Sequence, residues 1–132
     1  MKKTILLTIF LLICASCDPV SDMEANIENL TGQSLVVDFI STDPSFDKTL
    51  QIPSGEIVLF QEGFDIGSTF LEPSLVEYDS VVILNQKQEV LRIYKENDSG
   101  KNIYNVREYW MGSEPSKRFF KYEYEINTRD IE

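Results

Sequence analysis

The sequence predicts an all-β fold, a single antiparallel β-sandwich of about seven strands behind an N-terminal targeting segment. Short segments rich in β-branched and aromatic residues recur along the chain, and Gly, Pro, Asn and Asp residues separate them. Several of these segments alternate apolar and polar residues, which is typical of strands with one buried face. Beyond residue 22 the sequence contains no amphipathic helical pattern of ordinary length. These three observations together favour the sandwich.

The first half of the chain contains four predicted strands joined by turns. Residues 34–41 are the clearest, because Leu35, Val37 and Phe39 occupy alternate positions. Residues 53–55 (Pro-Ser-Gly) predict a turn, since proline fixes φ and glycine accepts a positive φ. Residues 62–78 contain two glycines and a proline and predict a long irregular connection that crosses between the sheets. The four strands are expected at residues 25–30, 34–41, 49–52 and 56–61.

The second half contains a predicted hairpin and the most regular strand of the chain. Residues 80–85 and 90–96 make the hairpin, and a turn at residues 97–100 follows it. Residues 102–111 fit either a short helix or a strand, and we favour a short helix or an irregular turn. Residues 118–127 alternate two sets of side chains, which predicts one buried and one wet face, with Phe119, Lys121, Glu123 and Glu125 on the wet face. The face expected to be buried carries Phe120, Tyr122, Tyr124 and Ile126.

The N-terminus has the layout of a secretory signal peptide. Lys2 and Lys3 precede an apolar run at residues 4–13, and the small residues Ala15 and Ser16 come shortly after it. The run has 10 residues, whereas a membrane-spanning helix needs about 20. The segment is therefore too short for a permanent span. An uncleaved signal or a single-pass anchor is the alternative.

Cys17 follows Ala15-Ser16 directly, and the whole pattern resembles the signal and lipobox of bacterial lipoproteins. The resemblance implies that the Cys17 thiol is linked to diacylglycerol and becomes the new N-terminus after cleavage. Two or three acyl chains attach a protein stably to a membrane. Cys14 is the rival thiol. It occupies the third position before the cleavage point, where the family usually has leucine.

The same resemblance implies the organisation of the chain. Residues 1–16 are expected to be a lipoprotein signal peptide, residues 17–22 a lipidated tether and residues 23–132 the β-sandwich domain. The partner implied for Cys17 is a membrane, bound through the lipid. The location implied is the cell envelope, with the outer membrane favoured over the inner one.

The composition excludes several classes of function. A net charge of −10 repels nucleic acid, so no nucleic-acid partner is expected. Histidine is absent, which removes the usual base of serine and cysteine hydrolases and the commonest zinc ligand. With Cys17 lipidated and Cys14 removed, the mature chain has no free thiol and no disulfide. The sequence carries no cofactor motif, and we expect no cofactor, no metal and no catalytic residue.

Loose motifs also recur in residues 76–131, namely YDSV at residues 78–81, NDSGKN at residues 97–102, Tyr109-Trp110 and YEYEI at residues 122–126. Together they resemble small Bacteroidetes-type envelope lipoproteins, which implies a compact β domain and no assigned activity. Asp79-Ser80-Val81 resembles the O-glycosylation sequon of exported proteins in such bacteria, which would make Ser80 the acceptor. An unmodified strand start is the alternative for Ser80.

Two groups of oxygen-bearing residues could form a catalytic or a cation-binding site, but each also has a purely structural interpretation. The 22 carboxylates allow an acid pair for glycoside hydrolysis, but alternating positions such as Glu123 and Glu125 favour a solvated surface. Residues 97–102 resemble a calcium loop. They lack the closing glutamate and contain Lys101, so a hairpin turn is the better interpretation.

The aromatic residues Tyr104, Tyr109 and Trp110 are candidates for stacking on a glycan if they are exposed. The leading hypothesis is a non-enzymatic, lipid-anchored envelope protein that binds another protein or a glycan. An accessory structural subunit of a surface assembly, joined by strand addition at a sheet edge, is the alternative. An acid-dependent hydrolase comes third and requires a cleft with two facing carboxylates.

Overall fold

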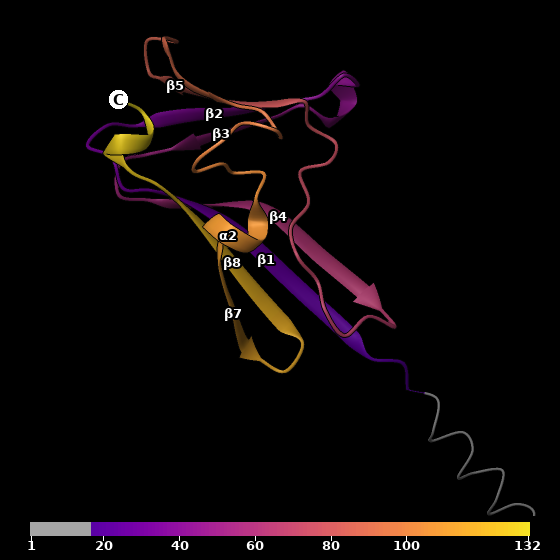
Figure 1. Cartoon of the computed structure of the whole chain (residues 1–132). Coiled ribbons are helices and arrows are strands. Elements are labelled where there is room, and N and C mark those ends of the chain that lie inside the picture. Colours follow the sequence, from indigo (N-terminus) through magenta and orange to yellow (C-terminus); the bar gives the residue numbers. More distant parts are fainter. Residues whose placement is uncertain (1–16) are drawn as a thin grey trace, which may run out of the picture.

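The computed structural model describes residues 17–132 and arranges them as two packed β-sheets of four strands each (Figure 1). The predicted all-β sandwich is confirmed. The predicted signal peptide, residues 1–16, lies outside the described residues. The strands are β1 (Val20–Asn29), β2 (Leu35–Ile40), β3 (Lys48–Ile52), β4 (Ile57–Ile66), β5 (Ser80–Asn85), β6 (Val90–Tyr94), β7 (Met111–Ser116) and β8 (Phe119–Ile126). The short helices of this part of the chain are η1 (Pro44–Phe46), α2 (Val106–Tyr109) and η2 (Thr128–Asp130).

The order of the strands differs from a simple antiparallel arrangement. Sheet A has the order β4-β1-β8-β7, and sheet B has the order β3-β2-β5-β6. Every neighbouring pair is antiparallel except β1 and β8, which run parallel. The prediction of purely antiparallel pairing is wrong for this pair, and the described chain has eight strands. Parallel neighbours need a long crossover connection, and the chain between β1 and β8 supplies one by passing through sheet B.

Two strands are longer than predicted. β1 begins at Val20, so residues 20–22 are part of sheet A and do not form a tether. β4 continues to Ile66, into the region predicted to be irregular. Gly63 fits within β4 because a Cβ there would lie only 3.0 Å from Met23 Cε, and glycine allows this close approach. The irregular connection is therefore limited to residues 67–79.

β7 has no counterpart among the predicted strands. All six of its residues are exposed, and they include Gly112 and Pro115, so no apolar alternation marks the strand. A β-bulge interrupts its pairing with β8 between Ser113 and Ser116. The short helix α2 falls within residues 102–111, where a short helix or irregular turn was favoured.

The two sheets are joined closely at one end and diverge at the other (Figure 1). At the close end, the turns at residues 30–34 and 53–56 carry the chain from one sheet to the other. At the diverging end, sheet A extends away from sheet B, and the start of β1 lies beside the end of β4. Residues 67–79 run back from there to β5.

The core lies between the inner faces of the two sheets. The predicted inner positions of β2 (Leu35, Val37 and Phe39) and the predicted positions Tyr122, Tyr124 and Ile126 of β8 are all buried, whereas Phe120, also predicted to be buried, is half-buried. A row of aromatic rings crosses the core. Its ring-centroid separations are 4.6 Å between Phe39 and Phe60, 5.9 Å between Phe60 and Trp110, and 5.4 Å between Trp110 and Tyr124.

Candidate functional site

The candidate site is the end of sheet A that carries Cys17, the predicted lipid acceptor. Cys17 is exposed, and only Asp18 and Pro19 separate it from the first residue of β1. The carbonyl oxygen of Pro19 accepts a hydrogen bond of 2.6 Å from the backbone N–H of Gly67. The chain is thus tied to the folded domain two residues after Cys17. The tether is shorter than the predicted residues 17–22, and lipidation of Cys17 stays a prediction.

Two other segments flank this end of the molecule. Val20 pairs with Ile66 at the end of β4. On the other side, the backbone N–H of Asp22 donates a hydrogen bond of 2.9 Å to the carbonyl oxygen of Arg118, in the turn between β7 and β8. The end of β4 and the β7–β8 turn therefore enclose the start of β1 within one sheet.

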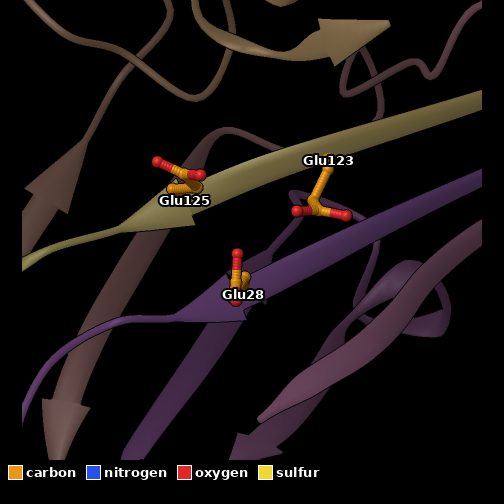
Figure 2. A group of neighbouring side chains, drawn as sticks. All are labelled: Glu28, Glu123 and Glu125. Carbon is orange, nitrogen blue, oxygen red and sulfur yellow. The ribbon is translucent and has the colours of Figure 1, made fainter. Parts of the chain in front are cut away.

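Three glutamates meet on the outer face of sheet A, the face turned away from sheet B. Glu28 lies on β1, and Glu123 and Glu125 lie on β8 (Figure 2). The parallel register brings Glu28 opposite Glu125, and one carboxylate oxygen from each residue lies within 4.8 Å of the other two. The pKa of Glu28 is raised because burial removes water from its carboxylate. The charges of Glu123 and Glu125 and a hydrogen bond with Glu123 add to the rise.

This arrangement differs from what glycoside hydrolysis requires. The two carboxylates of a glycosidase flank the scissile bond from opposite sides. Glu28, Glu123 and Glu125 instead project from neighbouring strands of one sheet face and are half-buried side by side. The cluster has oxygen ligands suited to a hard cation, but they come from one side only.

The repulsion within this cluster leads to a pH-dependent stability prediction. A carboxyl whose pKa is raised in the folded state costs stability as the pH rises through that pKa, because the folded state then releases the extra proton. Glu28→Gln is expected to raise the free energy of unfolding at pH 7 by about 0.5 kcal/mol. The gain should disappear below about pH 4, where glutamates are protonated in both states. Urea unfolding of both proteins at the two pH values measures this.

Glu56→Gln is the matched control, because Glu56 is exposed and outside the cluster. The control should leave stability nearly unchanged at both pH values. A Glu28→Gln gain that is equally large at acid and neutral pH would show that charge repulsion is not its cause.

The glycan-stacking prediction is wrong for Trp110. This side chain is only 5% exposed, and its Nε1–H donates a hydrogen bond of 2.7 Å to the carbonyl oxygen of Ile103. Tyr104 is half-buried and donates from its hydroxyl to the carbonyl oxygen of Tyr78 at 3.1 Å. Burial, with the nearby charge of Asp79, raises the pKa of Tyr104 to about 12.

Tyr109 is the member of the predicted pair that keeps part of its surface open. It is half-buried at the end of α2 and packs against the edge of the core. A hydrogen bond with Glu108 raises the pKa of the Tyr109 hydroxyl. Tyr109 and Trp110 therefore do not form one exposed pair: Tyr109 lies at the edge of the core, and Trp110 lies inside it.

Ser80 is the first residue of β5, pairs with Ile40 of β2 and is half-buried. Asp79 before it accepts a hydrogen bond of 2.7 Å from the hydroxyl of Thr42. Both observations fit an ordinary strand start. O-glycosylation of Ser80 stays a prediction.

The loop resembling a calcium site is held together by its own polar groups. The side-chain amide of Asn102, which is 2% exposed, donates to the carbonyl oxygens of Lys95 and Asp98 at 2.7 and 3.2 Å. The Asp98 carboxylate accepts a bond of 2.9 Å from the backbone N–H of Lys95. Gly100 has φ of 82°, which glycine adopts without strain. The turn interpretation is favoured, since these oxygens already have partners.

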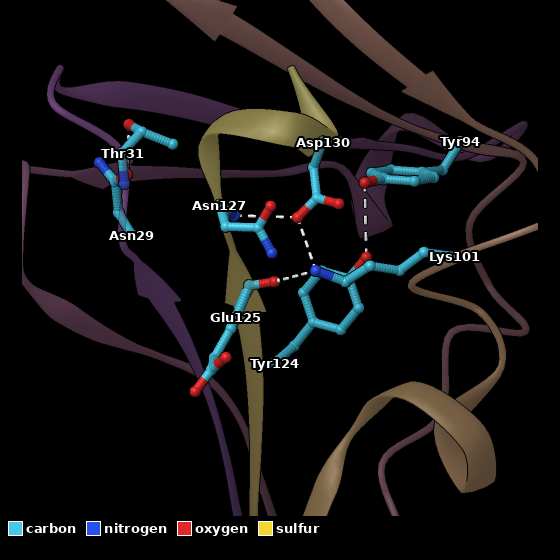
Figure 3. A network of polar contacts seen from close by, with 8 residues as sticks. All are labelled: Asn29, Thr31, Tyr94, Lys101, Tyr124, Glu125, Asn127 and Asp130. Atoms are coloured by element: carbon cyan, nitrogen blue, oxygen red, sulfur yellow. Dashed lines mark hydrogen bonds and ion pairs between the residues drawn. The ribbon is translucent and has the colours of Figure 1, made fainter. Parts of the chain in front are cut away.

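Lys101 takes part in a network that the sequence analysis missed. Its ammonium group lies 2.5 Å from Asp130 Oδ2 and donates to the carbonyl oxygen of Glu125 at 2.7 Å (Figure 3). It also lies 5.1 Å from the ring centroid of Tyr124. Lys101 thus connects the loop after β6 to the C-terminal segment. The sequence around Lys101, which follows an Asn-Asp-Ser-Gly turn, does not indicate that Lys101 pairs with Asp130, 29 residues away.

Among residues 17–132, no helix has the length and apolar character needed to cross a membrane. Comparisons with known proteins assign the chain to no group: no family model matches it, and no curated protein or solved structure matches it significantly.

Proposed function

We propose that this chain is a lipid-anchored protein of the bacterial cell envelope, with no catalytic role, whose β-sandwich binds another protein or a glycan. The observation that carries the proposal is the position of Cys17. It follows a signal-type segment directly, it is exposed, and it lies two residues before a point where the chain is tied to the domain. An acyl group at Cys17 would therefore hold one particular end of sheet A at the membrane.

The rest of the domain supports a binding role through its surface. With the Cys17 end at the membrane, β1 leads away from it, and its ten residues span about 33 Å. The turns at residues 30–34 and 53–56 then lie at the far end, accessible to a partner. Tyr109 remains the candidate for contact with a glycan. The glutamate cluster does not support hydrolysis, because its members share one open face.

The anchoring proposal is tested by replacing each cysteine of the signal region and following the protein in cells that are fed a labelled fatty acid. The unsubstituted protein is expected to take up the label and to fractionate with membranes. Cys17→Ala should take up no label and should retain residues 1–16, because lipid processing precedes cleavage at this kind of site. Cys14→Ala is the matched control and should behave like the unsubstituted protein. Absence of label in the unsubstituted protein contradicts the proposal.

Strand addition is the second candidate, and the edges of the sheets restrict where it could occur. The edge strand β7 contains Pro115 and a β-bulge, both of which hinder pairing with another strand. At the opposite edge of sheet A, the ammonium of Lys48 donates to the carbonyl oxygen of Phe60 on β4. The edge strand β6 of sheet B also has a register shift in its pairing with β5, but it has no proline, and its Val90 and Ile93 are 56% and 48% exposed. The other edge strand of sheet B, β3, contacts β4 of sheet A. β6 is thus the edge that favours this role.

A charge on the β6 edge tests this second candidate. Ile93→Lys is expected to reduce the amount of any partner that is cross-linked to the protein on cells, because a lysine on an edge strand hinders pairing. Fatty-acid labelling of Cys17 should stay unchanged. Equal cross-linking with and without the substitution would contradict strand addition at β6.

A further inference from the structure

We infer that three apolar side chains beside Cys17 enter the interfacial layer of the same bilayer that holds its acyl chains. These residues, Val20, Phe64 and Ile66, are called the apolar tip. The inference rests on the proposed lipid anchor at Cys17 and adds a second contact with the membrane, made by the protein itself. The occupant of the apolar tip is the lipid surface.

The apolar tip forms a continuous patch on the outer face of sheet A. Val20 and Ile66 are paired across β1 and β4, and Phe64 lies two residues before Ile66 on the same face. The neighbouring residues Ser21 and Met23 are buried on the inner face, which confirms that the tip points outward. Val20, Phe64 and Ile66 are 43%, 65% and 61% exposed.

The short connection to Cys17 places this patch at the membrane. Only Asp18 and Pro19 lie between Cys17 and Val20, and they span about 10 Å at full extension. Pro19 is hydrogen-bonded to Gly67, which follows Ile66 directly, so the connection cannot swing freely away from the tip. The glyceryl group on Cys17 lies at the surface of the hydrocarbon layer, and an interfacial segment is buried by about 5–10 Å there. Because the apolar tip lies no more than about 10 Å from Cys17, it can reach this interfacial layer.

The charges around the tip fit lipid head groups that carry both signs. Asp22 pairs with Phe64 on the outer face, so a carboxylate borders the apolar tip, whereas Asp65 pairs with Ser21 and projects from the opposite face of β4. The β7–β8 turn beside the start of β1 supplies Lys117 and Arg118. Carboxylates suit the ammonium groups of head groups, and the basic side chains suit their phosphates. Aromatic residues such as Phe64 are favourable at this depth.

The acyl chains alone provide stable attachment, so the apolar tip has a different consequence. A domain held by one flexible point can take many orientations. A second contact about 10 Å from the anchor restricts these orientations and directs β1 away from the bilayer. The glutamate cluster and the far turns would then be presented at a fixed distance from the membrane.

A tryptophan at residue 64 reports the depth of the apolar tip. The full chain carrying Phe64→Trp, lipidated in cells, is purified and reconstituted in phosphatidylcholine vesicles with or without bromine on the acyl chains. Bromine quenches only an indole that reaches the lipid. The emission of residue 64 is expected to fall at least about twofold in the brominated vesicles. The unsubstituted protein corrects for Trp110, its only tryptophan, which is buried.

Leu30→Trp is the matched control. Leu30 is 47% exposed and follows the last residue of β1, about 33 Å from Val20. Its emission should not be quenched. Equal emission of Phe64→Trp with and without bromine, in protein that carries the acyl label, overturns this inference and leaves the anchor in place. Blue-shifted emission without quenching would show that another protein surface covers the tip, which also overturns it. Absence of the acyl label instead contradicts the proposed function.

Discussion

Replacing Trp110 with alanine is expected to lower the free energy of unfolding by about 3–5 kcal/mol, the range for removing a large buried aromatic side chain. Trp110 is the central ring between Phe60 and Tyr124, at centroid separations of 5.9 and 5.4 Å. Its removal leaves a cavity in the row of rings, and it leaves the carbonyl oxygen of Ile103 without its donor. Denaturant unfolding followed by circular dichroism measures the loss.

Tyr109→Ala is the neighbouring control. Tyr109 is half-buried at the edge of the core, and its loss should cost less than half as much stability as Trp110→Ala. Trp110→Phe retains an aromatic ring and should lie between the two, which keeps the comparison informative if Trp110→Ala fails to fold. Equal stability of Trp110→Ala and the unsubstituted protein would mean that the tryptophan is on the surface, as glycan stacking requires.

Replacing Asn29 with alanine is expected to cost about 3–5 kcal/mol, because it removes the polar centre of the corner where the two sheets meet. Asn29 is fully buried at the end of β1 (Figure 3). Its Nδ2 donates to the carbonyl oxygens of Gln33 and Ile52, both at 2.8 Å. Its Oδ1 accepts from the backbone N–H and the hydroxyl of Thr31, at 2.9 and 2.6 Å. The substitution removes all four bonds. The Thr31 hydroxyl and the Gln33 carbonyl keep their mutual bond of 3.0 Å, but the buried N–H of Thr31 loses its partner, and each buried group left unpaired costs about 1–3 kcal/mol.

Asn105→Ala is the control for this substitution, because the Asn105 side chain is exposed and bonds only to the Glu108 carboxylate among the described residues. It should change the free energy of unfolding by less than about 0.5 kcal/mol. Amide hydrogen exchange adds a local readout. Asn29→Ala should speed exchange in the turns at residues 30–34 and 53–56 before it affects β8. Unchanged exchange in these turns would contradict the role given to Asn29.

Parts of the fold that depend on local patterns could be predicted from the sequence. Leu35, Val37 and Phe39 of β2 and Tyr122, Tyr124 and Ile126 of β8 occupy alternate positions, so these buried positions were predicted correctly. β7 could not be predicted, because all of its residues are exposed and it forms only by pairing with β8. The parallel pairing of β1 with β8 was equally inaccessible, since it joins residues about a hundred positions apart.

Parts of the candidate site could likewise be predicted from local sequence, and the other parts depend on tertiary structure. The position of Cys17 in the sequence identifies it as the predicted lipid acceptor, without any tertiary information. Alternation predicted that Glu123 and Glu125 share a face, but Glu28 joins them only through the parallel register of β1 and β8. The apolar tip exists because β4 extends to Ile66. The sequence did not predict this length, because Gly63 lies within the strand and glycine usually weakens a strand. Glycine at residue 63 lets β4 pack closely against Met23. The sequence alone does not reveal this contact.

The most direct test of the lipid anchor is the intact mass of the protein extracted from membranes, together with the mass of its N-terminal peptide. The expected protein begins at residue 17 and carries a diacylglyceryl group on the Cys17 thiol, with or without a further acyl chain on the new amino group. The N-terminal peptide should show the same added mass, confined to Cys17. A protein that retains residues 1–16, or one that begins at Cys17 with an unmodified thiol, would contradict the lipid anchor.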